Sequence, residues 1–345
     1  MTIDIKKINK ILIINLGGIG DMLLSIPALK ALSFSLPQVR ISLLTMPRSV
    51  EVIKGYQFVD DIILYKRGLK NKFSLIFTLK KIHPNMAINM RPLTSLISAI
   101  KMAILFVLTG AKYRVGRDIQ KRGFFLNIKV PEVDVAESHD LDYYLGMLKI
   151  LGIKSTDDKI NLIIDKLDTD YVEDILKKHG IEREDIVVGI NPGASLSTRR
   201  WPLEKFSSLS ELILKMRKCK IAITGSESEV AIAEKLQHIC KADLINLAGR
   251  TTVGQLMALI KRCNLFISND AGPVHLAAAL HTPLIAIFRA GDIVRYDPRR
   301  LSDKFTIVMY NKTSCSPCLK ARCTSMICLR DITPENVLKE VSRLI

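Results

Sequence analysis

A glycine-rich turn that ends in a carboxylate stands near the start of the chain. The segment 16–21 reads LGGIGD, follows an apolar run and leads at once into a helical pattern. Glycines at the end of a strand let the backbone approach a ligand, and Asp21 at the helix start is placed to accept a proton from a hydroxyl group. Its other interpretation is a helix cap. A dinucleotide-binding turn is not predicted, because its third glycine would fall at Leu23.

A second strand-to-helix turn combines hydroxyl groups with guanidinium groups. The segment 190–202 reads INPGASLSTRRWP, in which Ser195, Ser197 and Thr198 stand ahead of a pair of arginines that begins at Arg199. Hydroxyls, backbone N–H groups and arginines together are suited to binding a diphosphate. Two surface arginines before a helix are the ordinary alternative.

A third turn pairs a carboxylate with the start of a helix. The segment 268–276 reads SNDAGPVHL and again follows an apolar run. Asp270 is suited to sugar hydroxyls, while the N–H groups near Gly272 and His275 face a phosphate at the positive end of the helix. In the alternative interpretation Asp270 is a helix cap and His275 is a structural histidine. Two phosphate-suited turns in one half of the chain favour the binding role.

Four of the seven cysteines lie close together, at Cys315, Cys318, Cys323 and Cys328. A C-x-x-C pair followed by two more thiols is compatible with zinc, but the later spacings do not form a second C-x-x-C knuckle. Disulfides are not expected in a cytoplasmic protein. The cluster therefore stays open between a structural role and a metal site.

Short apolar, β-branched runs alternate with amphipathic helical patterns and place the three turns at strand ends. Strands are predicted at 11–16, 39–46, 61–65 and 86–90, and then at 186–191, 220–225, 265–269 and 283–288. With 345 residues, this alternation predicts an α/β protein of two doubly wound domains. We place the domains at 1–175 and 176–345, with the junction inside the charged region 160–185. The last helix is a candidate to pack back on the first domain.

Positive charge is concentrated in the first half of the chain. The net charge is +17, and residues 66–129 hold 14 basic residues and one acid. Such a patch attracts nucleic-acid phosphates, an anionic membrane or an acidic glycolipid, and charge alone does not choose among them. Lysines on ordinary helix faces are the plain alternative. The hydrophobic fraction of 48% excludes a disordered or collagen-like chain.

One helical pattern in this basic region has an apolar stripe. In residues 93–110, aliphatic side chains recur at helical spacing, and Lys101 is the only charge; these side chains are Leu93, Leu96, Ile97, Ile100, Ile104, Val107 and Leu108. The segment is too short and too polar to span a membrane. It is either a buried crossover helix or a helix at the bilayer interface, where anionic head groups would meet Lys112, Arg114, Arg117, Lys121 and Arg122. No signal peptide opens the chain, so we expect a cytoplasmic protein.

Taken together, the three turns resemble those of the ADP-heptose:lipopolysaccharide heptosyltransferases, glycosyltransferase family 9. The family has Ile-Gly-Asp before a helix with Pro-Ala-Leu, matched here at 19–21 and 27–29. It has Pro-Gly-Ala leading to Lys-Arg-Trp-Pro, matched at 192–194 and, with Arg in place of Lys, at 199–202. Its run Asn-Asp-Ser-Gly-Pro-x-His-Leu-Ala-Ala-Ala is present at 269–279, with Ala271 at the Ser position. The resemblance covers nearly the whole chain.

The resemblance implies a GT-B fold, with an N-terminal acceptor domain, a C-terminal nucleotide-sugar domain and a cleft between them. It implies an inverting transfer without a metal or other cofactor, in which Asp21 is the general base for an acceptor hydroxyl that attacks ADP-heptose. The donor-binding residues that it implies are Ser195, Ser197, Thr198, Arg199, Glu227, Asp270, Ala271, Gly272 and His275. The implied acceptor is an anionic lipid-linked glycan at the inner face of the cytoplasmic membrane, with no nucleic acid as partner. The acceptor or membrane contacts are assigned to Arg114, Arg117, Lys121 and Arg122.

Two departures from the family bear on this interpretation. Arg199 in place of Lys keeps the charge but changes its geometry. Where the family has Phe-Gly-x-Thr, the segment 288–292 reads FRAGD, and Arg289 either adds a phosphate contact or marks a changed donor or lost activity. Another nucleotide sugar with a different surface glycan, and a nucleotide-sugar-binding protein without turnover, therefore stay open as alternatives. A nicotinamide-dependent oxidoreductase is disfavoured by Leu23. Similar cysteine-rich loops in the family favour a structural role for the four cysteines.

Overall fold

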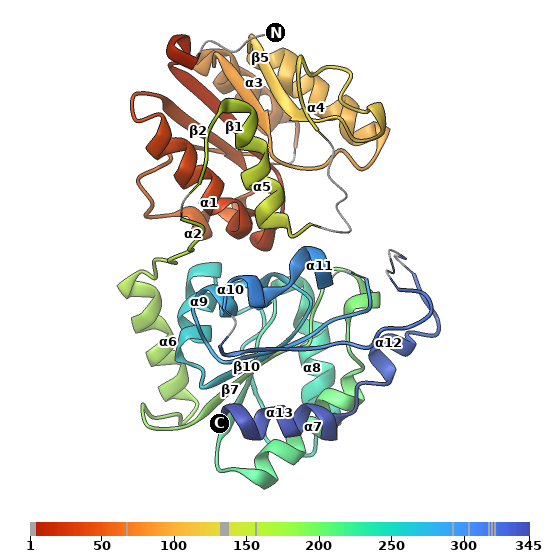
Figure 1. Ribbon diagram of the computed structural model, residues 1–345. Coiled ribbons are helices and arrows are strands. Elements are labelled where there is room, and N and C mark those ends of the chain that lie inside the picture. Colours follow the sequence, from red (N-terminus) through yellow and green to blue (C-terminus); the bar gives the residue numbers. More distant parts are fainter. Residues whose placement is uncertain are drawn as a thin grey trace. The chain divides into compact units, whose positions relative to one another are not determined.

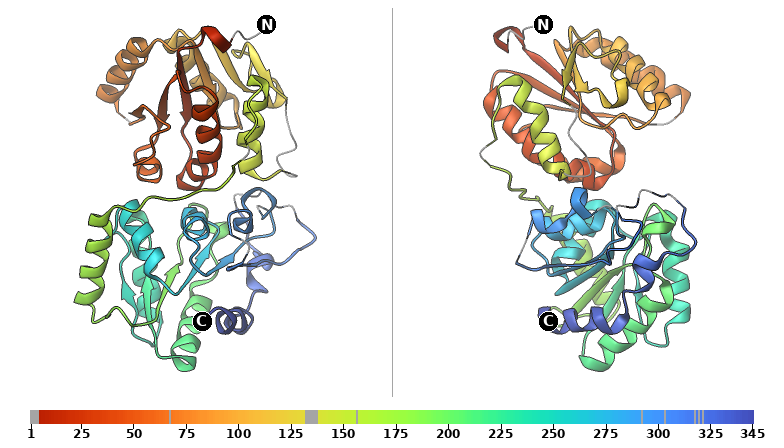
Figure 2. Two further views of the ribbon diagram at one scale, coloured as in Figure 1. Left: turned by 60° about the vertical axis from the view of Figure 1, so that its left-hand side comes forward. Right: turned by 45° about the vertical axis from the view of Figure 1, so that its right-hand side comes forward.

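Figure 1 shows the computed structural model of the chain, which describes residues 5–66, 68–131, 138–155, 157–291, 293–302, 304–316, 318, 320 and 322–345. The chain forms two compact units, Met1–Ile160 and Asn161–Ile345. Each unit is a parallel sheet with helices packed against it (Figure 2). The α/β class expected from the sequence is therefore confirmed.

The described residues of the first unit form a six-stranded sheet in which all neighbouring strands are parallel. The strands are β1 (Lys10–Asn15), β2 (Arg40–Thr45), β3 (Asp61–Leu64), β4 (Met86–Asn89), β5 (Tyr113–Arg117) and β6 (Ile128–Val130). Their order is β3-β2-β1-β4-β5-β6, with Ile11 opposite Ile41 on one side and Met86 on the other. Residues 11–15 of β1 are all buried, as expected for a central strand covered on both faces.

The helices of the first unit connect these strands. They are α1 (Ile19–Ser35), α2 (Val50–Ile53), α3 (Leu69–Ile82), α4 (Leu96–Thr109) and α5 (Asp140–Leu148), with short 3-10 turns η1 (Ile5–Lys7), η2 (Pro47–Ser49), η3 (Ile119–Lys121) and η4 (Lys149–Leu151). α1 packs against α5, and α3 packs against α4. Residues 22–29 of α1 are all buried, so this helix fixes whatever stands at its first turn.

The second unit repeats the arrangement of the first. Its strands are β7 (Val187–Asn191), β8 (Lys220–Ile223), β9 (Ile245–Asn246), β10 (Leu265–Asn269), β11 (Leu284–Ile287) and β12 (Thr306–Met309). The order is β12-β11-β10-β7-β8-β9, all parallel. Numbered from its own first strand, this sheet has the same order as the sheet of the first unit.

The helices of the second unit enclose an apolar core. They are α6 (Lys166–Lys178), α7 (Leu203–Met216), α8 (Val230–Ile239), α9 (Val253–Arg262), α10 (Gly272–Ala279), α11 (Ile293–Tyr296), α12 (Ile327–Arg330) and α13 (Pro334–Leu344), with 3-10 turns η5 (Ser197–Arg199), η6 (Glu227–Glu229) and η7 (Pro298–Arg300). Trp201 is buried edge-on to Phe206, with ring centroids 4.9 Å apart, and its indole N–H donates to the carbonyl of Ile332 at 3.1 Å. This contact ties α7 to the segment that leads into α13.

The eight predicted strands are present, with ends that differ by no more than two residues from the prediction. The sequence analysis did not predict β5, β6, β9 and β12. Arginines and a glycine interrupt β5. The strands β6 and β9 are only three and two residues long, and β12 is a four-residue strand at a sheet edge with three consecutive apolar residues.

The two units divide after Ile160, which is earlier than residue 175. α6 packs on α9, where Gly254 leaves room for Asp168: a Cβ at Gly254 would lie 2.2 Å from the Asp168 carboxylate. The last helix, α13, packs on α7 and buries Val337 and Val341 in the core of the second unit. Within the described residues, no helix combines the length and apolar character that crossing a membrane requires.

We predict that Gly189→Ala destabilises the second unit. A Cβ at Gly189 would lie 2.5 Å from Phe266 Cδ2 and 2.9 Å from Cys263 Sγ, and both neighbours are buried. Overpacking of this kind costs about 1 to 3 kcal/mol, measurable by urea unfolding. The double variant Gly189→Ala with Phe266→Leu should lose less stability than the sum of the single variants, because the smaller side chain returns the space. Additive losses would contradict the steric explanation.

Candidate functional site

Asp21 lies in the first turn of α1, directly after the turn that follows β1. One of its carboxylate oxygens accepts a hydrogen bond from the Gly18 N–H at 2.7 Å, which is the capping-box contact of this helix. A Cβ at Gly17 would lie 2.4 Å from Asp21 Cβ, so only glycine fits beneath this carboxylate. Asp21 therefore does cap the helix, and 17% of its side chain remains exposed. Capping and reaction with a ligand are thus compatible at this residue.

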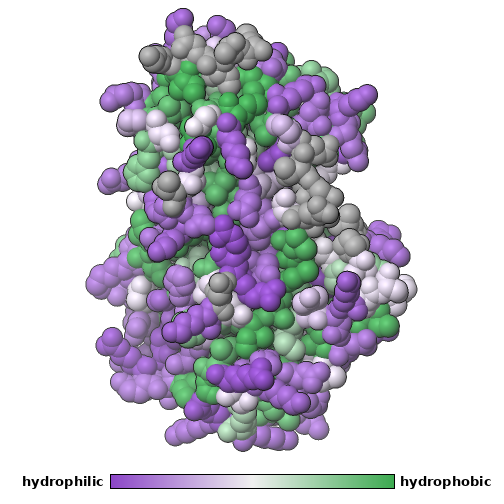
Figure 3. Space-filling view, viewed as in Figure 1, coloured by the Kyte–Doolittle hydropathy of each residue, from purple (hydrophilic) through white to green (hydrophobic). Residues whose placement is uncertain are grey.

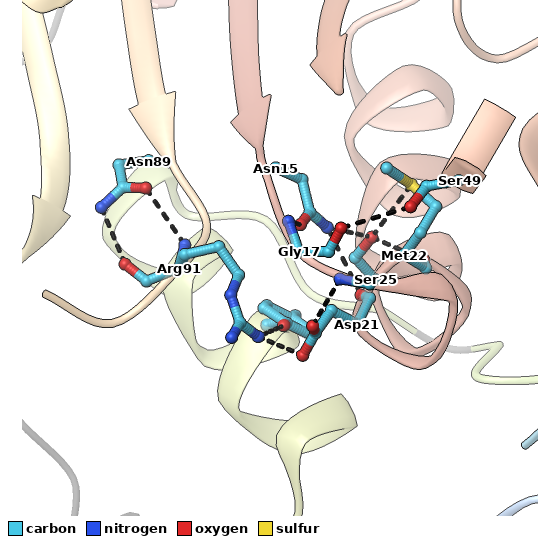
Figure 4. A network of polar contacts seen from close by, with 10 residues as sticks. Asn15, Gly17, Asp21, Met22, Ser25, Ser49, Asn89 and Arg91 are labelled. Carbon is cyan, nitrogen blue, oxygen red and sulfur yellow. Dashed lines mark hydrogen bonds and ion pairs between the residues drawn. The ribbon is translucent and has the colours of Figure 1, made fainter. Parts of the chain in front are cut away.

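Side chains around the turn hold its backbone (Figure 4). The buried Asn15 amide donates to the Asp21 carbonyl at 3.3 Å and to the Ser25 hydroxyl at 3.0 Å, and its oxygen accepts from the Gly17 N–H at 3.2 Å. Ser49, from the turn after β2, donates to the Gly17 carbonyl at 3.2 Å. The Asp21 carboxylate is consequently presented by a rigid support.

The second oxygen of Asp21 faces Arg91, which follows β4. Arg91 Nη1 forms an ion pair with Asp21 Oδ1 and donates to the Tyr144 hydroxyl at 3.2 Å (Figure 4). Asn89 fixes the backbone of Arg91, because its amide donates to the Arg91 carbonyl at 2.7 Å and its oxygen accepts from the Arg91 N–H at 3.2 Å. Burial raises the pKa of Tyr144 well above its ordinary value, so this hydroxyl keeps its proton. Sequence reasoning missed Arg91 and Tyr144.

The strand order explains why these residues meet. β1 lies between β2 and β4, and the chain runs from β1 outward in one direction to β3 before it returns to β4 on the other side. The loops that leave the carboxyl ends of β1 and β4 therefore run in opposite directions. This is a topological switch point, where open α/β sheets bind ligands. Asp21 and Arg91 stand on the two sides of that point.

The corresponding point of the second unit lies between β7 and β10. The loops that follow these strands are joined by Asn269, whose oxygen accepts from the Trp201 N–H at 3.0 Å and whose amide donates to the Pro192 carbonyl at 2.8 Å. Arg200 donates to the Ala194 carbonyl at 2.9 and 2.7 Å, so the second arginine of the pair holds the loop.

Asp270 and Arg199 form an ion pair across this switch point. The distance from Arg199 Nε to Asp270 Oδ2 is 3.2 Å, and the Asp270 side chain is only 2% exposed. The ring of Tyr296 in α11 lies beside both Arg199, at 5.7 Å from its guanidinium carbon, and His275, at 6.1 Å between ring centroids. Sequence reasoning missed Tyr296, which lies in a four-residue helix without a family motif.

The remaining predicted donor residues differ in their burial and in the loop or helix that carries them. Ala271 is the N-cap of α10 and Gly272 is its first residue, so the positive end of that helix follows Asp270 directly. Thr198 is buried, whereas Ser195 and Ser197 are exposed on the same loop. Glu227 is exposed in η6, after β8.

Glu229, which sequence reasoning missed, lies beside the loop after β7. Its carboxylate accepts from the Ser226 N–H at 2.8 Å and the Ser226 hydroxyl at 2.7 Å. A Cβ at Gly193 would lie 2.2 Å from Glu229 Oε1, so the glycine of the Pro-Gly-Ala motif makes room for this carboxylate.

Arg289 links the loop after β7 to the cysteine-rich segment. Its Nη1 donates to the Thr198 hydroxyl at 3.1 Å and to the Lys320 carbonyl at 2.7 Å, and the residue is buried. One cavity is lined by Thr198, Arg289, Cys315, Cys318, Lys320, Cys323, Ser325, Met326, Ile327 and Cys328. Asp292, the last residue of the segment 288–292, lies outside the described residues.

The four cysteines are free thiols around this cavity. A hydrogen bond from the Ser325 hydroxyl, followed by one from the Met326 N–H, lowers the pKa of the Cys323 thiol. Among the described residues, no three His, Cys, Asp or Glu side chains are gathered as a metal ion requires. The geometry therefore gives no support to the zinc interpretation.

Arg117, one of the predicted acceptor or membrane contacts, is buried in β5. Arg117 is 3% exposed, its guanidinium stacks on Tyr143 with 4.1 Å to the ring centroid, and it donates to the carbonyls of Pro131 and Tyr143. These contacts hold its guanidinium inside the first unit. Arg122 is partly buried and donates to the Thr94 carbonyl at 2.8 Å ahead of α4, while Arg114 is partly buried and Lys121 is exposed.

Comparisons with known proteins place these sites in a family. Residues 79–327 match glycosyltransferase family 9 (heptosyltransferase). Lipopolysaccharide heptosyltransferase 3 of Escherichia coli strain K12 is 27% identical over 298 residues, which cover 81% of this chain and 82% of that protein.

Solved structures show the same fold. A glycosyltransferase family 9 protein from Veillonella parvula has a TM-score of 0.80 at 22% identity, with 97% of both chains covered. E. coli heptosyltransferase WaaC, solved with ADP-2-deoxy-2-fluoro heptose, has a TM-score of 0.67 at 17% identity, with 97% of this chain and 99% of that chain covered. The expected GT-B fold is confirmed by these similarities. Since the family match spans most of the chain, this protein belongs to glycosyltransferase family 9, the heptosyltransferases.

Proposed function

We propose that this glycosyltransferase moves heptose from ADP-heptose to an anionic, lipid-linked acceptor of the lipopolysaccharide core, without a metal ion and with inversion at the anomeric carbon. The observation that carries the proposal is the Arg199–Asp270 ion pair beside the first turn of α10. It offers a cation and helix N–H groups to a diphosphate and a carboxylate to a sugar. ADP-heptose is the proposed donor because a solved relative binds an ADP-heptose analogue.

Asp21 would act as the general base on the acceptor. Its carboxylate is partly exposed and rigidly held, and it would take the proton from a hydroxyl as that oxygen attacks the anomeric carbon. A single attack from the face opposite the leaving ADP inverts the configuration. Positioning the base ahead of the reaction contributes to the rate, because little reorganisation remains.

The second unit would stabilise the departing diphosphate. Arg199 and the N–H groups at the start of α10 offer positive charge, and Arg289 adds a guanidinium beside the Thr198 hydroxyl. These groups supply the neutralisation for which other glycosyltransferases use a cation. Asp270 would accept hydrogen bonds from heptose hydroxyls, with His275 and Tyr296 next to it.

The partner surface of the first unit would be the bilayer that carries the acceptor. α4 has a buried face around Ala99, Met102 and Phe106, and an exposed apolar face. Among the side chains that the structure describes, the large apolar ones exposed on α4 and on the adjacent α3 are Phe73, Phe77, Leu96, Ile97, Ile100, Ile104 and Val107, of which Phe73 and Phe77 are 73% exposed. On the face in view in Figure 3, apolar residues reach the surface among hydrophilic ones.

Lysines flank this apolar surface. Lys70 and Lys80 lie three residues from Phe73 and Phe77 respectively, which places them on the same face of α3, and Lys101 lies between the exposed residues of α4. Each basic residue near an anionic bilayer contributes about 1 kcal/mol. Exposed apolar side chains with lysines beside them are suited to an anionic lipid surface. We therefore assign the proposed membrane contact to these residues of α3 and α4 in place of Arg117.

We predict that Asp21→Asn lowers turnover by about a hundredfold or more while the affinity for ADP-heptose stays nearly unchanged. The asparagine oxygen can still accept from Gly18, so the helix cap is kept, but the base is lost. Release of ADP with a lipopolysaccharide core acceptor measures turnover, and calorimetry measures donor affinity. Asp157→Asn, which alters an exposed ion pair with Lys30 in the same unit, is the matched control. Near-native turnover of Asp21→Asn would contradict the general-base role and leave Asp21 only its role in capping α1.

We predict that Arg199→Ala and Asp270→Asn separate the two parts of the donor. Arg199→Ala should weaken ADP and ADP-heptose alike by about tenfold or more, because it removes a charge from the diphosphate. Asp270→Asn should weaken ADP-heptose more than ADP. Calorimetry with both ligands tests this, with thermal unfolding as the check of folding. If Asp270→Asn lowered the affinity for ADP and ADP-heptose equally, this would contradict a contact between Asp270 and the sugar. If the unaltered protein bound UDP- or GDP-sugars more tightly than ADP-heptose, this would contradict ADP-heptose as the donor.

We predict that the protein co-sediments with vesicles of phosphatidylglycerol and phosphatidylcholine in equal parts, but not with phosphatidylcholine alone. The double variant Phe73→Ser and Phe77→Ser should weaken this binding at least tenfold, since each buried phenylalanine contributes about 1.5 to 3 kcal/mol. Phe34→Ser is the matched control, because Phe34 is 72% exposed at the end of α1. Equal losses in the two variants, or no vesicle binding at low salt, would exclude the α3–α4 surface.

A further inference from the structure

A cavity rich in sulfur lies beside the loop that carries Arg199, and the proposed reaction does not use its thiols. Thr198 and Arg289 contribute to its lining, together with four cysteines, which are Cys315, Cys318, Cys323 and Cys328. All four are free thiols. Thiols that share one cavity can form and exchange bonds with one another, so the cavity is a candidate for covalent chemistry.

The thiols differ in their access to solvent and in their hydrogen bonds. Cys323 is partly exposed, its Sγ accepts from the Met326 N–H at 3.4 Å, and it lies 3.5 Å from the Ser325 hydroxyl. The Ser325 hydroxyl, followed by the Met326 N–H, lowers the pKa of the Cys323 thiol, and this favours the thiolate that reacts with oxidants. Cys318 and Cys328 are each only 9% exposed. Cys323 is therefore suited to react first with a reagent from solution, and a buried thiol is suited to react second.

Cys318 attaches the cysteine-rich segment to the loop that follows β11. Its N–H donates to the Ala290 carbonyl at 3.4 Å. A Cβ at Gly291 would lie 1.9 Å from the Cys318 carbonyl oxygen, so this packing requires glycine. The backbone at Cys318 is thus in direct contact with the segment that carries Arg289.

Lys320 lies between Cys318 and Cys323 in the sequence, and its carbonyl orients Arg289. Arg289 Nη1 donates to this carbonyl at 2.7 Å and to the Thr198 hydroxyl at 3.1 Å. A covalent bond that confines the backbone around Lys320 therefore acts on Arg289 and, through Thr198, on the loop after β7.

We propose that this cavity is a site of reversible thiol oxidation, in which a peroxide joins Cys323 to Cys318 and the resulting disulfide weakens the binding of ADP through Arg289. The oxidation itself does not depend on the proposed transfer reaction. Its effect on ADP rests on the proposed function, because that function places the diphosphate beside Arg199 and Arg289.

The oxidation takes two steps. The Cys323 thiolate attacks one peroxide oxygen, so that the O–O bond breaks, an S–O bond forms, and the departing hydroxide takes up the thiol proton as water. Cys318 then attacks the sulfenic sulfur of Cys323, so that the S–S bond forms, the S–O bond breaks, and hydroxide leaves as a second water with the Cys318 proton. Two thiols together lose two electrons, and one peroxide is reduced to two waters.

The disulfide confines the backbone that now holds Arg289. It brings the Cα atoms of its two cysteines to within about 4.4–6.8 Å and closes a ring that contains Lys320. We expect the Lys320 carbonyl to move away from Arg289 when this ring closes. A guanidinium that has lost this acceptor must be ordered when a diphosphate binds, and it then contributes less to affinity.

Mass spectrometry after treatment with hydrogen peroxide and digestion with trypsin tests the disulfide directly. Trypsin cuts after Lys320 and Arg322, so the proposed bond joins the peptides 313–320 and 323–330, each of which holds two cysteines. A bond inside either peptide gives a different mass. The joined peptides should be the main oxidation product, and dithiothreitol should separate them.

Serine variants identify the two sulfurs within these peptides. Cys318→Ser and Cys323→Ser should each abolish the joined product, whereas Cys315→Ser should keep it. The matched control is Cys219→Ser, which removes a partly exposed thiol of the same unit whose pKa is raised by burial. This control should leave the yield of the joined peptides unchanged, and thermal unfolding checks that each variant folds.

Calorimetry with ADP tests the effect on the loop after β7. Oxidation of the unaltered protein should weaken ADP binding about threefold or more, and dithiothreitol should restore it. Cys318→Ser and Cys323→Ser should keep the affinity of the reduced protein after peroxide treatment. Arg289→Ala should bind ADP more weakly when reduced and lose no further affinity on oxidation, because the side chain that transmits the change is absent.

The outcomes separate the oxidation site from the proposed reaction. A disulfide confined to one peptide, or no disulfide at all, overturns the site. An unchanged ADP affinity in the joined protein overturns its effect on binding. A metal ion that co-purifies at one per chain and shields the thiols from alkylation also overturns the site, because the sulfurs would then be ligands. Failure of the reduced protein to bind ADP would contradict the proposed donor site, while the joined peptides would still support the oxidation.

Discussion

In each unit an aspartate and an arginine face each other across the point where the strand order reverses, and the candidate chemistry depends on these two ion pairs. In the first unit the aspartate follows the first strand and the arginine follows β4, whereas in the second unit the arginine follows the first strand, β7, and the aspartate follows β10. Loops that diverge from adjacent parallel strands leave room for a ligand. The ion pair in each unit fixes the positions of the two loops on either side of that ligand space.

Burial distinguishes the two pairs and suits them to different tasks. Asp270 is 2% exposed, so its charge depends on Arg199 and on the adjacent end of α10 for compensation, and this fixes its position. Asp21 is 17% exposed and is held by a backbone N–H and by Arg91, which leaves it open to a ligand. A buried, fixed carboxylate is suited to recognising hydroxyl groups. A partly exposed carboxylate is suited to exchanging a proton with one.

Features formed by residues close together in the sequence could be predicted, whereas contacts between residues far apart in the sequence could not. Asp21, Arg199 and Asp270 follow strands that are mainly apolar, so local patterns predict both the strand and the turn. Arg91 lies 70 residues from Asp21, and only the strand order shows that they meet. The burial of Arg117 was not predicted for a related reason, because β5 is recognised as a central strand only once β4 and β6 are placed beside it.

Arg289 shows how a departure from the family pattern can be absorbed by the fold. Arg289 donates both to the Thr198 hydroxyl and to the Lys320 carbonyl. A glycine at this position would remove the hydrogen bond between the Thr198 hydroxyl and the loop that follows β11. Both of these acceptors are neutral oxygens that orient the guanidinium. The substitution therefore brings a further cation to the loop that carries Arg199 and Arg200, and it joins that loop to the segment whose four thiols line the same cavity. An added cation beside a diphosphate-suited loop is more compatible with a retained donor site than with a lost one.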